Sequence, residues 1–379
     1  MNVAKDFYIY GYYGSKNAGD EAFRLAFRKL LPKQAELKFI RPSELAGNQV
    51  LSSQIRKYVC EGLAHLIVGG GAIIGDPYFW EHIPASTPYH IVSADIGSQD
   101  QLIERYQSSL SQMRTSWIRS EADTEQLQCL APKESILYYM PDIVFSLEAT
   151  PSVRSNVAVM GTAERNQKLL VQMRHYCENT VSFDQLQNKN MAVFLSDHYY
   201  DYKTIQSASV LEAIEREASD KIFLRQLRQS FDEITPYYNL YFFSLSYWHN
   251  AVDAFASHRV ARTSTKAPLY NIASCYIEPD TILDLMPYFD AAVSTKFHGL
   301  ILPMTAGVPV MNLGTSKKNH DLVKQMGLVS LKPNELTVTS FLNALKTVES
   351  AEYRTTLAET TRLSKELIIT SLSNPALWA

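Results

Sequence analysis

Short apolar runs alternate with longer amphipathic segments along almost the whole chain, and this alternation is the strongest constraint on the fold. Phe7–Tyr13 and Glu36–Ile40 have the length and composition of β-strands, and Asp20–Leu31 between them places its apolar residues on one helical face. Repeated strand–helix units of this kind build parallel sheets that are covered by helices. The sequence therefore predicts the α/β class.

The remaining strands and helices are expected at the same spacing. Predicted strands of the first half are His65–Val68, Tyr89–Ser93, Thr115–Ile118 and Ile136–Tyr139. Those of the second half are Met191–Leu195, Asn239–Leu245, Asp290–Ser294 and Val308–Leu313. Helices are expected to include Lys221–Phe231 and Glu335–Lys346.

One interruption of the pattern divides the 379 residues into two predicted domains. Residues 151–188 are polar, with at most one helix, and are interpreted as the interdomain connection. The domains are then residues 1–150 and 189–379, two doubly wound halves that face a cleft. The amphipathic segment Ala358–Thr370 is expected to pack back on both domains.

Composition excludes several classes of protein. The formal net charge of −3 gives no overall positive field for nucleic acid. Four cysteines without C-x-x-C spacing are expected to be free and mostly buried thiols, and no metal site is predicted. No apolar run is long enough for a transmembrane helix and no signal peptide is evident, so a cytoplasmic protein is expected. The sequence gives no prediction of oligomeric state.

The first candidate site is a glycine-rich loop between the first strand and the first helix. Its candidate residues are Gly11, Gly14, Asn17, Gly19 and Asp20. Glycine lets a backbone approach an anion or a sugar, and a helix start offers N–H donors. The spacing is not that of the dinucleotide fingerprint, and no acidic residue for a ribose ends the second strand. The alternative is a tight turn in which Asp20 only caps the helix.

The second candidate site directly follows another strand. Gly69, Gly70 and Gly71 stand where the carboxyl end of a parallel strand would contact a ligand, at a topological switch point. The alternative is a flexible loop. Asp76, a little further on, is interpreted either as a partner for a sugar hydroxyl or as a solvated turn residue.

The third candidate site has the most specific pattern. A strand ends at Ser294, Lys296 follows, and His298 and Gly299 open a short helix. Free N–H groups at a helix start favour an anion, and histidine transfers protons near neutral pH. We therefore expect a catalytic or ligand-binding role for His298, although a lone histidine is more often structural. Lys317, after the next strand, adds a cation or belongs to a solvated loop.

Taken together and in this order, the three motifs resemble the polysaccharide pyruvyl transferase family. The resemblance rests on Gly-Tyr-Tyr-Gly…Asn-Ala-Gly-Asp-Glu-Ala, Gly-Gly-Gly-Ala-Ile-Ile-Gly-Asp and Ser-x-Lys-x-His…Gly-Val-Pro, and it spans residues 8–330. It implies a GT-B-like fold of two Rossmann-like domains. It also implies an enzyme of surface polysaccharide biosynthesis that transfers pyruvate from phosphoenolpyruvate to a saccharide as a cyclic ketal.

The resemblance also implies a role for each candidate residue. His298 matches the family's histidine and is the expected general acid, which would protonate the methylene carbon of phosphoenolpyruvate. The donor's anionic groups would be held by Lys296, Ser294, Gly299, His198 and Lys317. The two glycine loops with Asn17, Asp20 and Asp76 would line the side of the saccharide acceptor, which is either free or lipid-linked. Phosphoenolpyruvate would be a co-substrate, and no further cofactor is expected.

Two departures from the family pattern keep alternatives open. Lys296 stands where the family usually has arginine, and a lysine cannot form the same bidentate contact with an anion. The strand Met191–Leu195 runs into Ser196-Asp197-His198, where the family usually has Ser-x-Arg. The alternatives are a nucleotide-sugar glycosyltransferase on the same architecture and a catalytically silent relative that binds saccharide.

Overall fold

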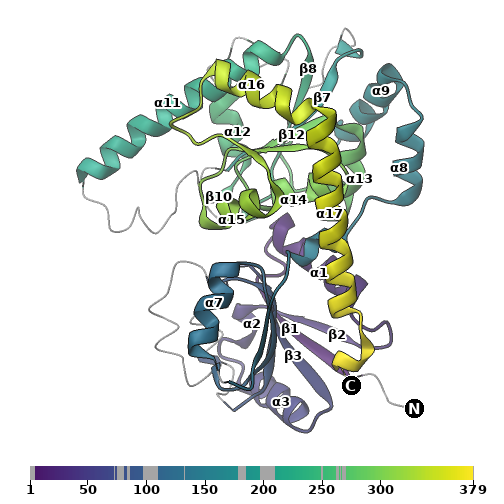
Figure 1. The fold of residues 1–379 in the computed structure, drawn as a ribbon, viewed down its shortest axis with the longest axis vertical. Helices are drawn as coiled ribbons and strands as arrows, with labels where there is room; N and C mark the ends of the chain where they lie inside the picture. Colours follow the sequence, from purple (N-terminus) through teal and green to yellow (C-terminus); the bar gives the residue numbers. More distant parts are fainter. Residues whose placement is uncertain are drawn as a thin grey trace. The chain divides into compact units, whose positions relative to one another are not determined.

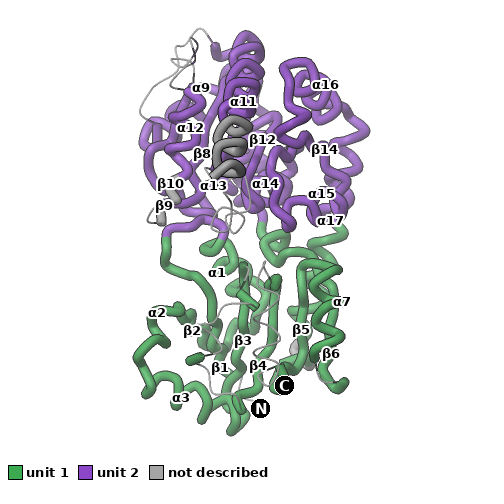
Figure 2. Tube along the Cα trace, turned by 90° about the vertical axis from the view of Figure 1, so that its left-hand side faces the viewer, with its two compact units in different colours: residues 1–15, 20–147, 363–379 green, residues 16–19, 148–362 purple. Residues whose placement is uncertain are grey.

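The computed structural model forms two compact units (Figure 2). Unit 1 consists of residues 1–15, 20–147 and 363–379, and unit 2 consists of residues 16–19 and 148–362. The residues that the structure describes are 5–71, 73–74, 81–82, 86–96, 110–131, 133–177, 185–196, 210–248, 251–261, 264, 266 and 270–378.

Unit 1 contains a six-stranded, fully parallel sheet (Figure 1). Its strands, in the spatial order β2-β1-β3-β4-β5-β6, are β2 (Leu37–Ile40), β1 (Asp6–Tyr10), β3 (Ala64–Gly71), β4 (Tyr89–Ala94), β5 (Met113–Ile118) and β6 (Ile136–Tyr139). The helical segments are α1 (Ala18–Leu30), α2 (Pro42–Leu45), α3 (Gln49–Cys60), α7 (Glu121–Leu130) and η1 (Ile143–Ser146).

Unit 2 contains a second six-stranded parallel sheet. Its strands, in the order β11-β8-β7-β12-β13-β14, are β11 (Tyr270–Ile272), β8 (Tyr238–Phe243), β7 (Lys189–Phe194), β12 (Ala291–Ser294), β13 (Val310–Asn312) and β14 (Val329–Ser330). Its helical segments are α8 (Pro151–Ala158), α9 (Thr162–Met173), α11 (Val210–Ile234), α12 (Ala254–Ala261), α13 (Pro279–Leu285), η4 (Met286–Tyr288), α14 (His298–Thr305), α15 (Lys317–Met326) and α16 (Val338–Glu349).

The other elements of the described residues are two short strands, a terminal helix and a terminal turn. Strands β9 (Tyr247–Trp248) and β10 (Ala251–Val252) pair as a small antiparallel hairpin in unit 2. The terminal helix α17 (Ala351–Leu372) contributes its residues up to 362 to unit 2, while its last residues and the terminal turn η5 (Pro375–Trp378) belong to unit 1.

Both sheets are doubly wound, because the strand order of each reverses once near its centre. In unit 1 the chain moves from β1 outward to β2 and then back across to β3, so the switch point lies between β1 and β3. In unit 2 the corresponding switch point lies between β7 and β12. The predicted α/β class with two Rossmann-like domains is therefore confirmed, and each switch point marks a carboxyl edge where ligands bind in such sheets.

Local sequence explains why these elements form where they do. Strand β7 is apolar at every position from Met191 to Phe194 because helices cover both faces of a parallel sheet. Helix α15 begins after Ser316, whose side chain accepts a hydrogen bond from Asn319 N, and it ends at Gly327 in the left-handed conformation. Helix α14 is apolar almost throughout and is buried on all sides.

Two expectations about the fold were wrong. Residues 151–188, interpreted as a connection with at most one helix, contain α8 and α9, and α9 buries Asn166, Leu169 and Met173 within unit 2. The four cysteines are free as expected, but Cys60 and Cys129 are exposed instead of buried. Within the described residues, no helix is long and apolar enough to cross a membrane.

Candidate functional site

The junction between β12 and α14 forms the carboxyl edge of unit 2 at its switch point. The side chain of Ser294, the last residue of β12, accepts a hydrogen bond from Lys296 N at 2.9 Å and donates to Lys296 O at 2.8 Å. Gly299 lies behind it, where an added Cβ would fall 2.4 Å from Ser294 Oγ. Ser294 and Gly299, predicted to hold the donor, therefore shape the turn that presents His298.

His298 is the first residue of α14, as predicted, and its side chain is half-buried. Its imidazole lies against Gly19 at the start of α1: a Cβ built on Gly19 would be 2.2 Å from His298 Nδ1. The N-cap residue of α14, Phe297, makes no side-chain capping hydrogen bond, and the start of a helix favours an anion. Within unit 2, the structure thus brings Gly19 of the first sequence motif against His298 of the third.

The segment that carries Gly19 is fixed to unit 2 by backbone hydrogen bonds. Ala18 N donates to Leu245 O at 2.7 Å, and Tyr247 N donates to Lys16 O at 3.0 Å, around a β-bridge between Asn17 and Ser246. Asn17 Oδ1 also accepts from Gly19 N at 3.1 Å. The side chain of Asn17 therefore caps the start of α1, and Asp20 lies in the first turn of this helix.

Lys296 is engaged in an ion pair with a residue that sequence reasoning did not single out. Its Nζ lies 2.6 Å from Oδ2 of Asp253, a carboxylate that is only 2% exposed and that also accepts from Leu245 N at 3.0 Å. Burial raises the pKa of Asp253, and Lys296 opposes that shift. The pair carries little net charge. The positive charge of Lys296, which was expected to hold a donor anion, is therefore already balanced by the carboxylate of Asp253.

A second helix start lies beside the first. Asn319, in the first turn of α15, donates to Thr295 O at 3.2 Å, and Lys318 Nζ sits 5.6 Å from the ring centre of Phe297. Lys317 and Lys318 are both exposed. The starts of α14 and α15 therefore lie together at the carboxyl ends of β12 and β13, with His298 and two lysines around them. Helix starts and cations both favour an anion.

The second glycine motif packs against a helix. A Cβ on Gly69 would lie 2.6 Å from the ring of Phe27, and one on Gly70 would lie 2.6 Å from the ring of Phe23. Both rings belong to α1, so these glycines let the helix approach the carboxyl end of β3 closely. Gly71 also has a positive φ, and its nearest neighbour is Asp20 Oδ1 at 3.8 Å.

The glycines of the first loop have local packing partners as well. A Cβ on Gly11 would meet the ring of Tyr13, whose hydroxyl donates to Gly69 O at 2.6 Å. Gly14 has a φ of 75°, and its N–H donates to Glu21 Oε1. The tight-turn alternative therefore describes Gly11 and Gly14 well.

Two predicted site residues, His198 and Asp76, lie outside the described residues. Among the residues that are described, no group of three or more His, Cys, Asp or Glu side chains could hold a metal ion.

The carboxyl edge of unit 1 contains a buried ion-pair cluster that the sequence did not reveal. Arg119 follows β5, and its guanidinium contacts Asp95 Oδ2 at 2.6 Å and Asp142 Oδ2 at 2.8 Å. All three residues are buried. The cluster connects the carboxyl ends of β4, β5 and β6. In the sequence, the one sign of this cluster is a charged residue shortly after each of the three strands.

The sequence matches no protein-family model and no curated protein, but many solved structures share the fold. HepE from Anabaena in complex with UDP and glucose superposes with a TM-score of 0.56 at 10% identity, over 98% of each chain. The UDP-GlcNAc 2-epimerase of Neisseria meningitidis bound to UDP-GlcNAc gives 0.53 at 11% identity, over 98% of this chain and 100% of that one. The UDP-GlcNAc 2-epimerase of Methanocaldococcus jannaschii gives 0.52 at 12% identity, over 95% and 99%. These likenesses confirm the expected GT-B-like fold.

Proposed function

We propose that the carboxyl edge of unit 2 binds the diphosphate of a nucleotide sugar and that the protein is an enzyme acting on that sugar, with glycosyl transfer as the reaction. The observation that carries this proposal is the meeting of two helix starts, His298 and two exposed lysines at one sheet edge. A diphosphate offers several oxygen atoms, and it can accept from both helix starts at once. Lys317 and Lys318 would balance its charge.

The fold supports a nucleotide sugar as the ligand. Two of the similar structures contain UDP or UDP-GlcNAc. In parallel sheets of this type, ligands bind outside the carboxyl ends of the strands at the switch point, which is where β7 and β12 adjoin here. A saccharide, free or lipid-linked, would be the acceptor.

His298 has a defined task in this proposal. As the sugar leaves, negative charge grows on the diphosphate, and an imidazole at the start of α14 would stabilise it or supply a proton. Gly19 sets the position of the imidazole by direct contact. We expect His298→Ala to lower turnover about 10²–10⁴-fold, the usual range for the loss of a general acid or base.

The direct test is calorimetric titration of the full chain with UDP and with UDP-GlcNAc. The double variant Lys317→Gln/Lys318→Gln should weaken UDP binding about tenfold or more, since two charge-assisted contacts are removed. Lys168→Gln, at an exposed lysine of α9 in unit 2, is the matched control. Equal UDP affinity in the double variant and the native chain would show that the diphosphate does not bind at this edge.

Pyruvyl transfer from phosphoenolpyruvate is the second candidate. It is favoured by the contact between Gly19 and His298, which unites two of the motifs that carry the family resemblance. The Lys296–Asp253 ion pair counts against it, because the lysine in the arginine position is already balanced. Release of phosphate from phosphoenolpyruvate that depends on a saccharide, without UDP binding, would replace the first proposal with the second.

A further inference from the structure

A separate cavity of about 490 Å³ opens in unit 2 at the amino-terminal ends of β7 and β8. The carboxyl-edge site follows the opposite ends of the sheet strands, so the two sites are distinct. The residues that line the cavity come from the loop before β7 and the start of β7, the end of α11, the turn that leads into β8, and α16: Gln187, Asn188, Lys189, Ile234, Pro236, Tyr237, Tyr238, Leu342, Leu345, Lys346 and Glu349. A volume of this size accommodates a small organic ligand.

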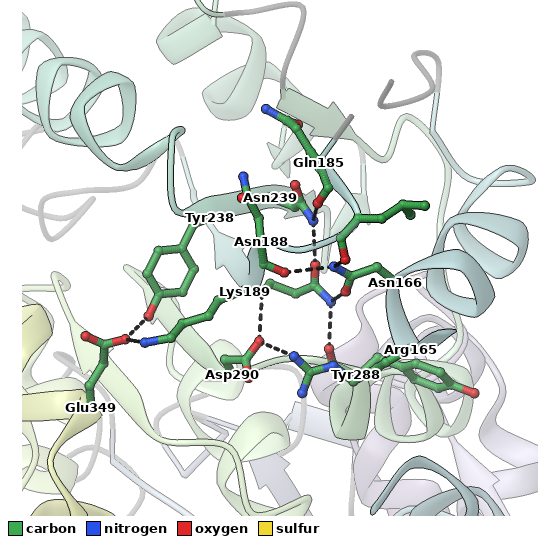
Figure 3. Close-up of polar contacts among 12 residues, drawn as sticks. Arg165, Asn166, Gln185, Asn188, Lys189, Tyr238, Asn239, Tyr288, Asp290 and Glu349 are labelled. Carbon is green, nitrogen blue, oxygen red and sulfur yellow. Dashed lines mark hydrogen bonds and ion pairs between the residues drawn. The ribbon is translucent and has the colours of Figure 1, made fainter. Parts of the chain in front are cut away.

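One wall of the cavity is a polar group of three residues (Figure 3). Glu349 accepts from both the Lys189 ammonium and the Tyr238 hydroxyl. Burial alone would raise the pKa of Glu349, but the hydrogen bonds and charge of its partners hold that pKa below its ordinary value. Glu349 is therefore ionised at neutral pH and balances Lys189. Lys346 adds a second ammonium, so the lining has two lysines for one carboxylate.

An aromatic ring lies beside these charges. Tyr237 is 69% exposed, which is high for a tyrosine, and its backbone is fixed because Tyr237 O accepts from Lys189 N at 3.0 Å. An exposed ring with polar groups around it suits the apolar face of a sugar, whose hydroxyls then reach amides and carboxylates. Gln187 and Asn188 supply amides at the same cavity.

Buried amides hold the loop that forms the rim. Asn166, from α9, donates to Leu186 O at 2.7 Å and to Asn188 O at 2.8 Å. Asn239, from β8, donates to Gln185 O at 3.1 Å (Figure 3). The side chains of Asn166 and Asn239 are almost completely buried, so the rim is set before any ligand arrives.

We propose that this cavity is a binding site for an acidic saccharide, with the sugar ring on Tyr237 and its carboxylate toward Lys346. The apolar floor of Ile234, Leu342 and Leu345 would take the carbon face of a second ring. The site would hold part of a saccharide chain away from the carboxyl edge. It stands on the cavity alone and does not depend on the reaction assigned to that edge.

The test is saturation-transfer NMR on the full chain with two matched probes. One is the hyaluronan disaccharide, glucuronic acid joined to N-acetylglucosamine, and the other is the neutral disaccharide chitobiose. The acidic probe should bind the native chain more tightly. Lys346→Gln should weaken the acidic probe about tenfold and leave chitobiose unchanged, because only a charge-assisted contact is lost. Tyr237→Ala should weaken both probes.

Two exposed residues outside the cavity provide controls. Lys332→Gln and Tyr138→Ala should leave both probes unchanged, and UDP titration of all variants should match the native chain. Failure of both disaccharides to bind the native chain would overturn the proposal. So would affinities that neither Lys346→Gln nor Tyr237→Ala alters. Binding of inorganic phosphate, through Lys346 and without either disaccharide, would assign the cavity to a simple anion and also overturn it.

Discussion

The imidazole of His298 rests on Gly19, with room for a hydrogen atom but none for a methyl group. The glycine belongs to the first turn of α1, after the first strand of the chain, and the histidine opens α14 after β12. Because residues 16–18 are hydrogen-bonded to residues 245–247, which follow β8, the neighbouring glycine has little freedom to move away from the imidazole. The position of the imidazole is therefore set by a residue far away in the sequence.

Substitution of this glycine should displace the imidazole. In Gly19→Ala the new Cβ would fall 2.2 Å from Nδ1, so either His298 or the loop must move. We expect UDP affinity or turnover to fall about tenfold or more, since small misplacements of a catalytic group have large effects. Calorimetry and kinetic assays provide the measurement.

Gly161→Ala is the control for that substitution, because a Cβ added at Gly161 would have no heavy atom within 4 Å and this glycine lacks a positive φ. It should behave like the native chain. If Gly19→Ala also has the UDP affinity and turnover of the native chain, the contact between Gly19 and His298 does not contribute to function.

The Lys296–Asp253 pair should matter for stability more than for ligand binding. In Lys296→Met the buried carboxylate loses its ammonium partner, and the free energy of unfolding should fall by about 2–3 kcal/mol. UDP affinity should change little, because the lysine's charge is already balanced. The double variant Lys296→Met/Asp253→Asn should recover much of the lost stability in urea unfolding. A large loss of UDP affinity with unchanged stability would instead make Lys296 a ligand contact.

Arg119 should be a major stabilising residue of unit 1. Arg119→Met leaves Asp95 and Asp142 buried without their shared guanidinium, and breaking a buried pair typically costs about 3–5 kcal/mol. Urea unfolding followed by circular dichroism would measure it. Arg56→Met, at an exposed arginine of α3, should have little effect. Similar stability in the two variants would contradict a structural role for the cluster.

Acid should destabilise unit 1 through His90. Burial, with a smaller effect of the neighbouring His65, lowers the pKa of His90 from 6.5 to about 4. The folded state therefore binds this proton less readily than the unfolded state, and stability is lost as pH falls from about 6.5 to about 4. The expected loss over that window is about 2–3 kcal/mol.

The pH effect can be assigned with one variant. His90 packs at 5.3 Å between ring centres against Trp378, so His90→Phe keeps an aromatic ring while removing the titration. The unfolding midpoint of this variant should depend less on pH between 6.5 and 4. Some dependence should remain, because burial also lowers the pKa of His65. An unchanged pH profile would show that other groups control acid unfolding.

The alternation of apolar runs predicted much of the architecture from particular residues. The runs that begin at Tyr89 and Met191 became buried parallel strands, because a strand covered on both faces must be apolar along its length. The run that begins at Ile136 became the edge strand β6, in which Ile136 and Tyr138 are exposed. The break after Ser294 and the helix start at His298 were also predictable, since strand-forming and helix-forming residues change over at that point. By contrast, residues 151–173 are polar enough to conceal two helices.

By itself, then, the sequence determined the α/β class, the strands of unit 1, the four central strands of the sheet in unit 2 and the place of His298 at a helix start, because these depend on local composition and periodicity. It did not reveal the edge strands β11 and β14 or the hairpin of β9 and β10, which are only two or three residues long. Only the tertiary structure decided that Gly19 touches His298, that Asp253 neutralises Lys296 and that Gly69 and Gly70 serve helix packing. Such contacts join residues from separate strand–helix units. These contacts depend on the order of the strands within each sheet, and a local sequence pattern does not contain that information.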